Sequence, residues 1–430
     1  MNRRFVLIFI VSLFIFSLRT TLEVQQAKAD GTIYIRADGS VDPPTPLLQH
    51  VGDVYSLTGN VSGSLVIERS SIVFDGKGFT LDGAGGVVGI NVTDENNVTL
   101  NNVKVSGCDY GVWFHTSSNS SILNSTVTGC VWFGITIYDS TGCTVSVNNV
   151  TNNHFNVWVK NSSHTAVSNN MLVGSQSYGA SALYIDHDSY DNEFCSNVFM
   201  LNYDDIYLAP YSHNNTLSGN SFQNGIDING SPDNVFIHNN FVSRSQISNY
   251  YNSSNAWDNG FEGNFWKDYD GTDLNNDGIG DSLCLIGVNN TDYYPLMGMF
   301  HSFDTFLGYD VNVISNSTVE DFEYFKSNST IKMHVSNATE TQTSGFCRVC
   351  IPHALMSEPY NVTIDGADPL FWNYTLYDNG TYRWIYFSYQ HSTLEVVIVP
   401  ELASFLILPI FIITALVAAI IYKSKCIGTG

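Results

Sequence analysis

A short strand pattern repeats about every 22 residues between residues 89 and 228 of this sequence. Each copy has an aliphatic residue or Phe at its second and fourth positions. Turn-rich segments of this length cannot each bury a core, but stacked segments can share one, so the repeat predicts a solenoid. The copies are Gly89–Val92, Gly111–Phe114, Gly134–Ile137, Asn156–Val159, Ala182–Ile185, Asp205–Leu208 and Gly225–Ile228.

The residues between the copies refine this prediction. Alternation with a period of two places the second and fourth side chains of each copy inward. A polar turn, a second strand and an Asn-rich corner follow each copy. An Asn that points inward at a tight corner can bond backbone groups of neighbouring turns, which would otherwise be buried unpaired. The candidate corner residues are Asn102, Asn124, Asn149, Asn170, Asn197, Asn220 and Asn240.

Together these features predict an all-β fold, a right-handed parallel β-helix. An up-and-down sandwich of short strands is the alternative. It gives no reason for one tetrapeptide to recur at a near-constant interval, whereas in a parallel β-helix that interval is one turn of the solenoid.

Charge and composition narrow the function. The 430 residues carry 17 Lys and Arg against 40 Asp and Glu, a formal net charge of −23, and only 13% of residues are charged. We therefore predict no nucleic-acid partner, because phosphate backbones require a basic surface. Hydrophobic residues make up 44% of the chain, which excludes a disordered acidic tail. The acidity also argues against polyanionic sugars and favours neutral or calcium-bridged glycans.

The two ends of the sequence predict a protein held at the cell surface. Residues 1–29 combine a basic start, an apolar stretch and a small-x-small cleavage pattern, as in a secretory signal peptide. Residues 401–422 are apolar and long enough for a transmembrane helix. Lysines follow this segment, so residues 423–430 are expected to form a cytoplasmic tail, with the ectodomain outside the cytoplasmic membrane.

Between the ends we predict two domains. Residues 30–300 form the β-helix, with an N-terminal cap at 30–70 and a C-terminal cap at 263–297. Residues 301–400 hold alternating apolar runs separated by Asn-Gly and Asp-Gly turns, which is typical of a small β-sandwich. We expect this sandwich to act as a stalk. Its predicted strands are Tyr309–Ile314, Thr330–Val335, Phe346–Ile351, Tyr360–Ile364 and Tyr382–Tyr389.

Several segments resemble the NosD-type β-helix family, also described as carbohydrate-binding and sugar-hydrolase repeats. Gly31–Ile35 and Ile72–Gly76 resemble its first coils, and Gly263–Tyr269 with Asp277–Asp281 resembles its closing segment in archaeal cell-surface proteins. The resemblance covers residues 31 to about 300 and implies a right-handed parallel β-helix. It leaves the activity open, because this scaffold carries lyases, hydrolases, binding modules and a copper-linked periplasmic protein.

The C-terminal cap contains a candidate calcium loop. Oxygen-bearing side chains alternate at Asp273, Asn275 and Asp277, a Gly follows, and Asp281 adds another carboxylate. This matches the first nine positions of a calcium loop, in which the Gly lets the chain fold back. The twelfth position holds Cys284 in place of a bidentate Glu, so the loop predicts structural calcium of modest affinity. The alternative is an acidic turn without metal.

The third residue of each repeated strand is expected to point outward, and several of these residues are aromatic. Rungs stack at about 4.8 Å, so Trp113 and Trp158 should lie roughly 10 Å apart on one face, near the repeat of a sugar chain. We therefore predict carbohydrate binding by Trp113, Trp158, Tyr184 and Tyr207, with Asp186 as a hydroxyl acceptor. The alternative is that the aromatic residues stack for stability or are covered by another domain or protomer.

Catalysis has weaker support in the sequence. Asp204-Asp205 superficially resembles the acidic pair of polygalacturonase-like β-helices, but the Gly-His-Gly and Arg-x-Lys patterns of that class are absent. The few cationic residues in the coils from 89 to 260 are not in register, as a uronan lyase would need. We therefore assign no catalytic residue.

Copper is a second candidate cofactor after calcium. Cys347, Cys350, His353 and Met356 offer soft ligands that suit Cu(I). The run lies outside the β-helix, and Pro352 interrupts any helix that would align these side chains. Two nearby cysteines outside the cell more often form a disulfide or lie buried.

The sequence thus favours a surface-anchored β-helix that binds carbohydrate or surface polymer without catalysis. A glycan-degrading lyase or glycoside hydrolase, a copper-handling protein and a purely structural envelope component are the alternatives.

The calcium loop yields a direct test. A chelator should lower the thermal midpoint of the ectodomain, because calcium that binds the folded loop stabilises the folded state. Calorimetry with and without excess EDTA measures the shift. An unchanged midpoint, together with no calcium by elemental analysis, would contradict the prediction.

Overall fold

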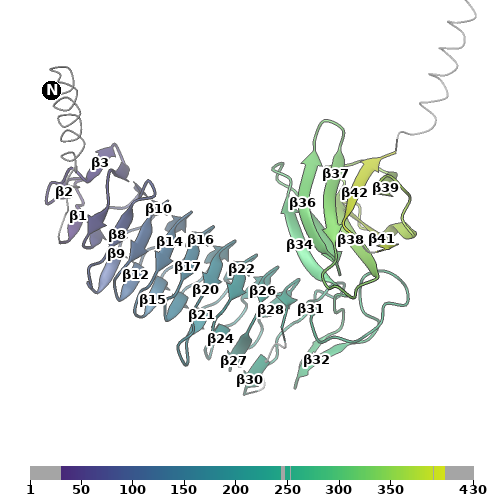
Figure 1. The fold of residues 1–430 in the computed structure, drawn as a ribbon. Coiled ribbons are helices and arrows are strands. Elements are labelled where there is room, and N and C mark those ends of the chain that lie inside the picture. Colours follow the sequence, from purple (N-terminus) through teal and green to yellow (C-terminus); the bar gives the residue numbers. More distant parts are fainter. Residues whose placement is uncertain (1–30, 244–246, 252, 391, 402–430) are drawn as a thin grey trace, which may run out of the picture. The chain divides into compact units, whose positions relative to one another are not determined.

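Residues 31–243, 247–251, 253–390 and 392–401 are described by this computed structural model (Figure 1). The predicted signal peptide and, apart from Glu401, the predicted membrane helix lie outside these residues. Within the described ranges no helix is long and apolar enough to cross a membrane. All regular elements in these ranges are β-strands, as the predicted all-β class requires.

The described chain forms two compact units. The first holds residues 31–216, 222–234, 247–251 and 253, and the second holds 217–221, 235–243 and 254–401 without 391.

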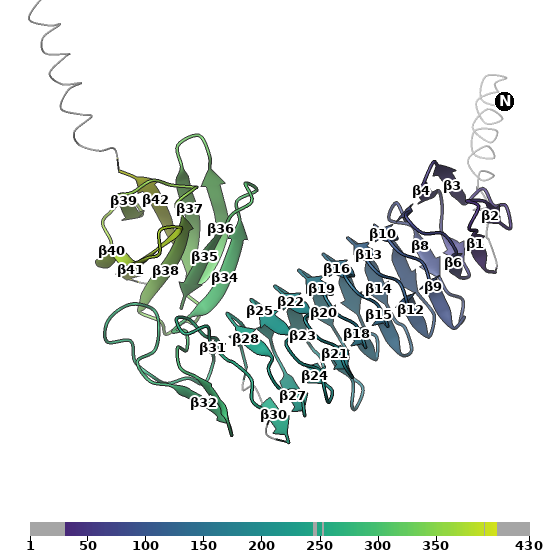
Figure 2. The ribbon, with the colours of Figure 1, turned by 180° about the vertical axis from the view of Figure 1, so that it is seen from behind.

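The first unit is a parallel β-helix with three sheets, each taking a short strand from successive turns (Figures 1 and 2). The first sheet runs, in spatial order, through β2 (Val41–Asp42), β1 (Ile33–Ile35), β6 (Leu65–Ile67), β9 (Val88–Thr93), β12 (Tyr110–His115), β15 (Phe133–Tyr138), β18 (Phe155–Lys160), β21 (Ser181–Asp186), β24 (Asp204–Leu208), β27 (Gly225–Asn229) and β30 (Ile247–Tyr250). Only its β1–β2 pair is antiparallel among the pairs described.

The other two sheets have shorter strands. In the first unit the second sheet contains β22 (Glu193–Cys195), β19 (Ala166–Ser168), β16 (Thr144–Ser146), β13 (Ser121–Leu123), β10 (Thr99–Asn101), β7 (Val73–Asp75), β4 (Val54–Leu57) and β3 (Leu48–Val51). The third contains β23 (Val198–Met200), β20 (Met171–Val173), β17 (Asn149–Thr151), β14 (Thr126–Thr128), β11 (Lys104–Ser106), β8 (Thr80–Asp82) and β5 (Val61–Ser62).

The predicted repeat is confirmed strand by strand. Its seven copies lie in β9, β12, β15, β18, β21, β24 and β27. Their second positions pair in parallel register and are completely buried, so one apolar column runs through the interior: Ile90, Val112, Ile135, Val157, Leu183, Ile206 and Ile226. Burial of one such side chain contributes about 1.5–3 kcal/mol relative to leaving it exposed.

Inward polar side chains at the corners link one turn to the next. The side-chain oxygen of Asn170 accepts from the backbone N of Asn148 at 2.9 Å, and that of Asn197 accepts from the backbone N of Asn170 at 3.0 Å. In the preceding turn the hydroxyl of Ser125 accepts from the backbone N of Val103. A second ladder at another corner joins Asn192, Asn215 and Asn234.

The predicted corner ladder was only partly right. Asn170, Asn197 and Asn220 are buried ladder residues, with Asn220 bonded to Asn239 in the second unit. Asn102, Asn124 and Asn149 are exposed. Asn102 and Asn124 have φ of 51° and 49°, so they make the left-handed bend and the residue that follows points inward. Asn240 is buried but bonds the backbone of Phe300.

The second unit contains short strands of the last coils and a sandwich. The strands of the last coils are β28 (Val235–Ile237), β29 (Asn240–Phe241), β31 (Phe265–Trp266), β32 (Cys284–Gly287) and β33 (Asn290–Asp292). Two further strands, β25 (Thr216–Ser218) and β26 (Ser221–Phe222), span the division between the units. One antiparallel sheet is β34 (Met299–Asp304), β35 (Asp310–Ser315), β38 (Ser344–Pro352), β41 (Tyr382–Gln390) and β40 (Phe371–Asp378). The other is β36 (Thr318–Phe325), β37 (Thr330–Ser336), β42 (Leu394–Pro400) and β39 (Tyr360–Ile364).

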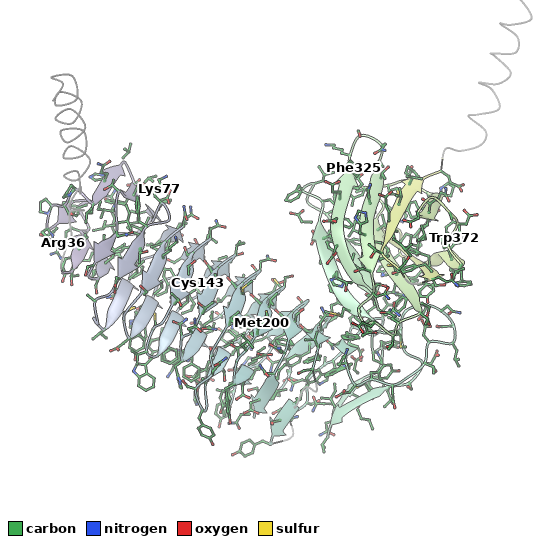
Figure 3. The ribbon with its side chains drawn as sticks, viewed as in Figure 1. Arg36, Lys77, Cys143, Met200, Phe325 and Trp372 are labelled. Atoms are coloured by element: carbon green, nitrogen blue, oxygen red, sulfur yellow. The ribbon has the colours of Figure 1, made fainter. Side chains whose placement is uncertain are left out.

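These two antiparallel sheets share one buried core, the arrangement of a β-sandwich. Val313 and Phe387 come from one sheet, and Met333 and Val396 from the other. Phe325 and Trp372 lie on strands of the two different sheets (Figure 3). The five predicted strands correspond to β35, β37, β38, β39 and β41, whereas β34, β36, β40 and β42 were not predicted.

The ladder can be tested with two adjacent asparagines. Asn148→Ala should lower the free energy of unfolding by about 2–4 kcal/mol, because it leaves the backbone N of Ser125 and the carbonyl of Ile122 buried without their partner. Asn149→Ala is the control, because Asn149 is exposed, and it should change stability by less than about 0.5 kcal/mol. Urea denaturation measures both. Equal effects of the two substitutions would contradict the ladder.

Candidate functional site

The outward side of the first sheet carries the predicted binding residues. Strands β12, β15 and β18 have six residues each, and their first, fourth and last side chains are outward apart from the buried Thr136. We call the resulting surface the aromatic face. Its columns are Tyr110, Phe133 and Phe155; then Trp113, Thr136, Trp158, Tyr184, Tyr207 and Asp227; then His115, Tyr138, Lys160 and Asp186.

The predicted central column is therefore confirmed as a line of paired residues, but its spacing was wrong. Trp113 and Trp158 both neighbour Thr136 in the register. Their ring centroids lie 6.3 Å apart rather than about 10 Å, because the long side chains lean toward each other. Thr136 is completely buried, and its hydroxyl has no hydrogen-bond partner among the described residues.

Most rings of the aromatic face cover one another. Phe133 stacks on Phe155 at 5.0 Å and on Trp158 at 4.3 Å, with interplanar angles of 16° and 19°. Trp158 also stacks on Tyr138 at 6.1 Å and on Tyr184 at 6.2 Å. A ring held in this way gives its faces to its neighbours and only its edge to solvent. This geometry agrees with the alternative interpretation, in which the aromatic residues stack for stability.

Trp113 is oriented differently. It meets Tyr110 at 84° and Tyr138 at 77°, and it is tilted by 59° from Trp158. None of the described rings stacks on it in parallel. Trp113 is half-buried, and like Tyr207 it has no described ring stacked in parallel on its face.

Asp186 is not a free hydroxyl acceptor but a buried anchor. Its carboxylate accepts from the indole N of Trp158 at 3.3 Å and lies 3.5 Å from the ammonium of Lys160. It also contacts the imidazole of His187 and accepts from the backbone N of that residue. The ammonium of Lys160 in turn lies 5.2 Å from the ring of Trp158. Asp186 therefore fixes Trp158 and places two basic side chains beside the aromatic face.

The third column was missed from the sequence except for Asp186. His115, Tyr138, Lys160 and Asp186 pair in register two residues beyond the central column. The repeat was interpreted as four residues long, whereas the strands extend to six. Continuing the period-two alternation by one step would have found this column.

The acidic pair Asp204-Asp205 is split by the strand. Asp205 is completely buried and accepts from the amide of Asn202 and from the backbone N of Asn224. Burial raises the pKa of Asp205, against these hydrogen bonds. Asp204 is partly exposed; burial and then the charges of Asp227 and Asp205 raise its pKa to about 6. The Asp205 carboxyl group is thus buried inside the solenoid, whereas that of Asp204 is partly exposed.

The candidate calcium loop is closed by its own backbone. The carboxylate of Asp273 accepts from the backbone N of Asp277 and of Gly278, and that of Asp281 accepts from the backbone N of Leu274. The side-chain amide of Asn275 donates to the carboxylate of Asp277 at 3.1 Å. Burial raises the pKa of Asp273, and the charges of Asp277 and Asp281 add to this shift. Calcium at this loop stays a prediction.

An arginine of the sandwich fixes the same loop. Arg348 on β38 donates to the carbonyl of Asp277 at 2.8 Å and to the carboxylate of Glu262 at 2.8 Å. Gly278 has φ of 82°, and an added Cβ there would lie 3.2 Å from Arg348. The loop is therefore packed within the second unit rather than suspended in solvent.

Comparison with known proteins gives one family model that matches part of the first unit. Residues 56–212 match the NosD family model. That family is described as periplasmic copper-binding protein (NosD). No curated protein sequence matches this chain.

Solved β-helix structures show weaker likeness. DFA-IIIase from Arthrobacter chlorophenolicus, solved without its lid, is 16% identical over 47% of this chain and 56% of its own, with a TM-score of 0.39. A mutant of that enzyme in complex with DFA-III is 15% identical over 44% and 50%, with a TM-score of 0.35. A tailspike protein from an Escherichia coli bacteriophage is 12% identical over 86% and 66%, with a TM-score of 0.39. This chain spans about half the length of the DFA-IIIase chains.

The run from Cys347 to Met356 is the candidate copper site of the sequence. Among the described residues, no group of three His, Cys, Asp or Glu side chains could hold a metal ion. Cys347 lies in the sandwich core, and Cys350 is three residues along the same strand, so the two thiols point to opposite faces of β38. His353 is beside Asp378, and Met356 belongs to the core. The soft-ligand run of the sequence thus does not converge on one ion.

The pKa of Asp204 gives a test of this site. The pKa of Asp204 in the folded protein lies above its ordinary value. Between about pH 4 and pH 6 the folded protein therefore binds more protons than the unfolded chain. As pH rises through that window, ionisation of Asp204 lowers the free energy of unfolding. Asp204→Asn should therefore raise the denaturation midpoint at pH 7.5 and change it little at pH 3.5. Asp188→Asn, in an exposed turn, is the control. A gain for Asp204→Asn that is the same at both pH values would contradict the assignment.

Proposed function

We propose that the first unit binds a neutral polysaccharide, or a surface polymer rich in neutral sugars, outside the cytoplasm. The observation that carries this proposal is Trp113, an indole on which no described ring stacks in parallel, within an aromatic face whose other large rings mostly stack on one another. A sugar ring offers an apolar C–H surface that packs on such an indole, so Trp113 is the contact point for the ligand.

Polar side chains around the indole complete the binding surface. His115 lies 6.3 Å from the Trp113 ring between centroids, and its Nε2 is 3.6 Å from the carboxylate of Asp139. Asn161 donates to the same carboxylate at 2.6 Å. These groups supply donors and acceptors for sugar hydroxyls on the side of the third column. Trp158, Tyr184, Tyr207 and Asp186 support the surface, with the first three contributing ring edges.

Binding without catalysis is favoured over hydrolysis. Asp204 and Asp205, the adjacent carboxylates that a hydrolase could use, are not both available to a ligand, because Asp205 is buried in the interior. The basic residues beside the face are also compensated, since Lys160 lies against Asp186. Neutral sugars suit this balance better than polyanionic ones, which would meet a chain of formal net charge −23.

The proposed location is the cell surface. The match to a family described as periplasmic supports a position outside the cytoplasm. In this proposal residues 1–29 direct secretion, residues 401–422 hold the protein in the membrane, and calcium stabilises the loop at 273–281. Each of these three elements has its own test in the intact cell or by chelation.

The binding proposal predicts a specific loss. Trp113→Ala should weaken retention on an immobilised neutral polysaccharide by at least about tenfold, roughly 1.4 kcal/mol of binding free energy. Affinity electrophoresis against a panel that includes glucan, mannan and xylan measures it, with near-ultraviolet circular dichroism to confirm folding.

Trp132→Ala is the matched control. Trp132 is 49% exposed and lies before β15, outside the defined columns, so its loss should leave retention unchanged. Full retention by Trp113→Ala, or no retention of the wild-type ectodomain on any member of the panel, would contradict the proposal.

A further inference from the structure

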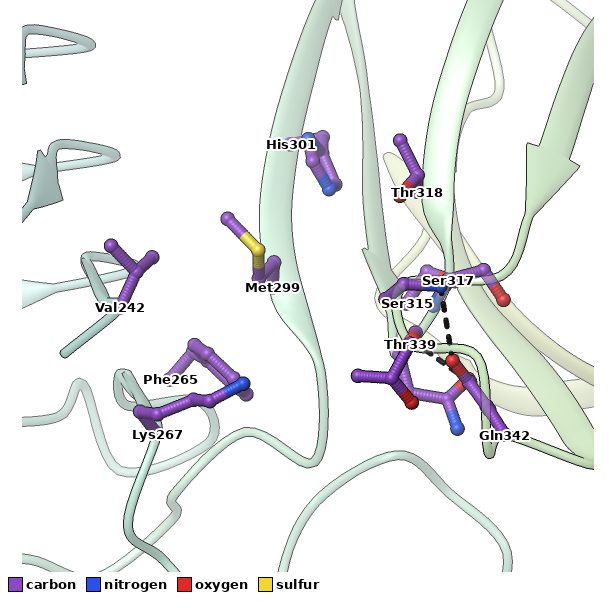
Figure 4. Close-up of a pocket in the computed structure, with 12 residues that line it drawn as sticks. Val242, Phe265, Lys267, Met299, His301, Ser315, Ser317, Thr318, Thr339 and Gln342 are labelled. Carbon is purple, nitrogen blue, oxygen red and sulfur yellow. Dashed lines mark hydrogen bonds between the residues drawn. The ribbon is translucent and has the colours of Figure 1, made fainter.

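A pocket of about 380 Å³ in the second unit shows no convergent set of polar groups among the described residues (Figure 4). The side-chain N of Gln342 donates to the carbonyls of Asn316 and Ser344. Lys267 and His301 line the pocket from places that lie apart (Figure 4). Specific small-molecule sites depend on polar groups that converge on the ligand, so this pocket assigns no ligand.

Two buried thiols in the first unit face each other across adjacent turns of the β-helix. Cys108 and Cys130 are 2% and 3% exposed, and their Sγ atoms lie 3.6 Å apart. Both are free thiols in this structure. Each lies two residues after the end of a strand, β11 or β14, and these two strands pair in parallel register. The two cysteines therefore occupy equivalent corner positions, one turn apart.

Other turns carry ladder residues at this same corner. Asn153 lies two residues after β17, and its side-chain oxygen accepts from the backbone N of Cys130 at 2.8 Å. Farther along the solenoid, Asn202 accepts from the backbone N of Ser175 at 3.0 Å. A thiol is a weak hydrogen-bond acceptor, so Cys130 is a poor substitute for an Asn oxygen. The ladder of this corner therefore weakens between Cys130 and Cys108, where a covalent bond would replace the hydrogen bond as the link between turns.

The neighbouring glycines leave room for the two sulfur atoms. An added Cβ at Gly89 would lie 3.2 Å from the Sγ of Cys108, and one at Gly111 would lie 3.0 Å from the Sγ of Cys130. Adjacent rungs are about 4.8 Å apart, which falls within the range of about 4.4–6.8 Å between the Cα atoms of disulfides. The two sulfur atoms have to approach from 3.6 Å to about 2.05 Å, which rotation of both side chains and a small shift of the corner supply.

We infer that Cys108 and Cys130 form a disulfide bond that joins two turns of the solenoid beside the strand of Trp113. The inference rests on the proposed location outside the cytoplasm, where disulfides persist. The oxidant is another disulfide, either a small molecule or a protein. One cysteine thiolate attacks a sulfur of the oxidant and releases its first thiolate, and the second cysteine thiolate then displaces the other from the mixed disulfide. Two thiols of the chain thus lose two protons and two electrons, and the oxidant takes them up as two thiols.

Cys108 is the first nucleophile in this exchange. The hydrogen bond between the two thiols lowers the pKa of Cys108 and raises that of Cys130. The thiolate is the reactive form, so the cysteine with the lower pKa attacks first. Both groups are buried in the folded protein, and oxidation therefore takes place during folding or a local opening of the corner. Once formed, the bond is shielded from reductants.

Peptide mapping detects the bond. The purified full-length chain is reduced and unfolded in urea, refolded in equimolar reduced and oxidised glutathione, and alkylated with iodoacetamide in urea. Chymotrypsin cuts after Trp113 and Phe114, between the two cysteines. We expect the two peptides to stay joined until a reductant is added. Cys143 (Figure 3) is buried at another corner, where its thiol donates to the carbonyl of Ser117 at 3.0 Å, and it should be alkylated.

Stability gives a second measurement. The chain refolded in excess dithiothreitol should have a thermal midpoint roughly 5–10 °C below that of the chain refolded in the glutathione mixture, because the bond closes a loop of 22 residues. Cys130→Ser should remove this difference. Ser125 holds a ladder position at another corner, so serine suits such a corner and the variant should fold. Cys143→Ser is the matched control and should keep the difference.

Two results would overturn the inference. The first is alkylation of both Cys108 and Cys130 in every sample with native circular dichroism, whether refolded or isolated from cells. The second is a midpoint difference that persists in Cys130→Ser. A bond that forms on refolding but is absent from the chain as isolated supports the inference and contradicts the proposed location. Failure of the disulfide and failure of the location are therefore distinguishable.

Discussion

The hydrogen bond from a corner side chain to the backbone of the adjacent turn is the interaction on which the solenoid depends. A tight corner leaves backbone N–H and C=O groups inside the protein with no strand to pair with. Asn148 solves this at one corner, since its oxygen accepts from the backbone N of Ser125 and its amide donates to the carbonyl of Ile122. Repetition of the same bonds at Asn170 and Asn197 holds successive turns in one register.

The outward side chains of the strands follow the same register. Because the turns are aligned, residues at equivalent strand positions form straight columns, and large aromatic residues in neighbouring columns come within stacking distance. Stacking then competes with ligand binding for the same ring faces. Trp158 illustrates the outcome, since Phe133, Tyr138 and Asp186 together fix its ring. Both indoles neighbour Thr136, but Trp113 has Asn91 on its other side where Trp158 has Tyr184, so one stacking partner is missing at Trp113.

The sequence predicted what depends on the period and missed what depends on side-chain orientation. The seven strands and their register follow from the inward aliphatic residues, since a slip of one residue would expose all of them. The corner ladder was misplaced by one residue at two corners: left-handed Asn124 precedes the inward Ser125, and exposed Asn149 follows the inward Asn148. Both residues of each pair suit a polar corner. The 10 Å spacing assumed that each indole stands over its own strand, and the actual distance reflects rotamers. Four sandwich strands were missed; Glu320 and Asp321 on β36, for example, interrupt the apolar alternation at a bulge.

The ladder hydrogen bonds recur from one turn of the β-helix to the next, so the number of turns can change during evolution. Duplication of one turn of about 22 residues would insert a copy whose corner asparagine finds the same partners above and below, with the interior column continued by one aliphatic residue. Deletion of one turn would equally allow the two flanking turns to form the ladder bonds with each other. The length of the outward surface is therefore free to vary between relatives in steps of one strand, while the identity of each outward residue can change without disturbing the bonds that hold the turns together.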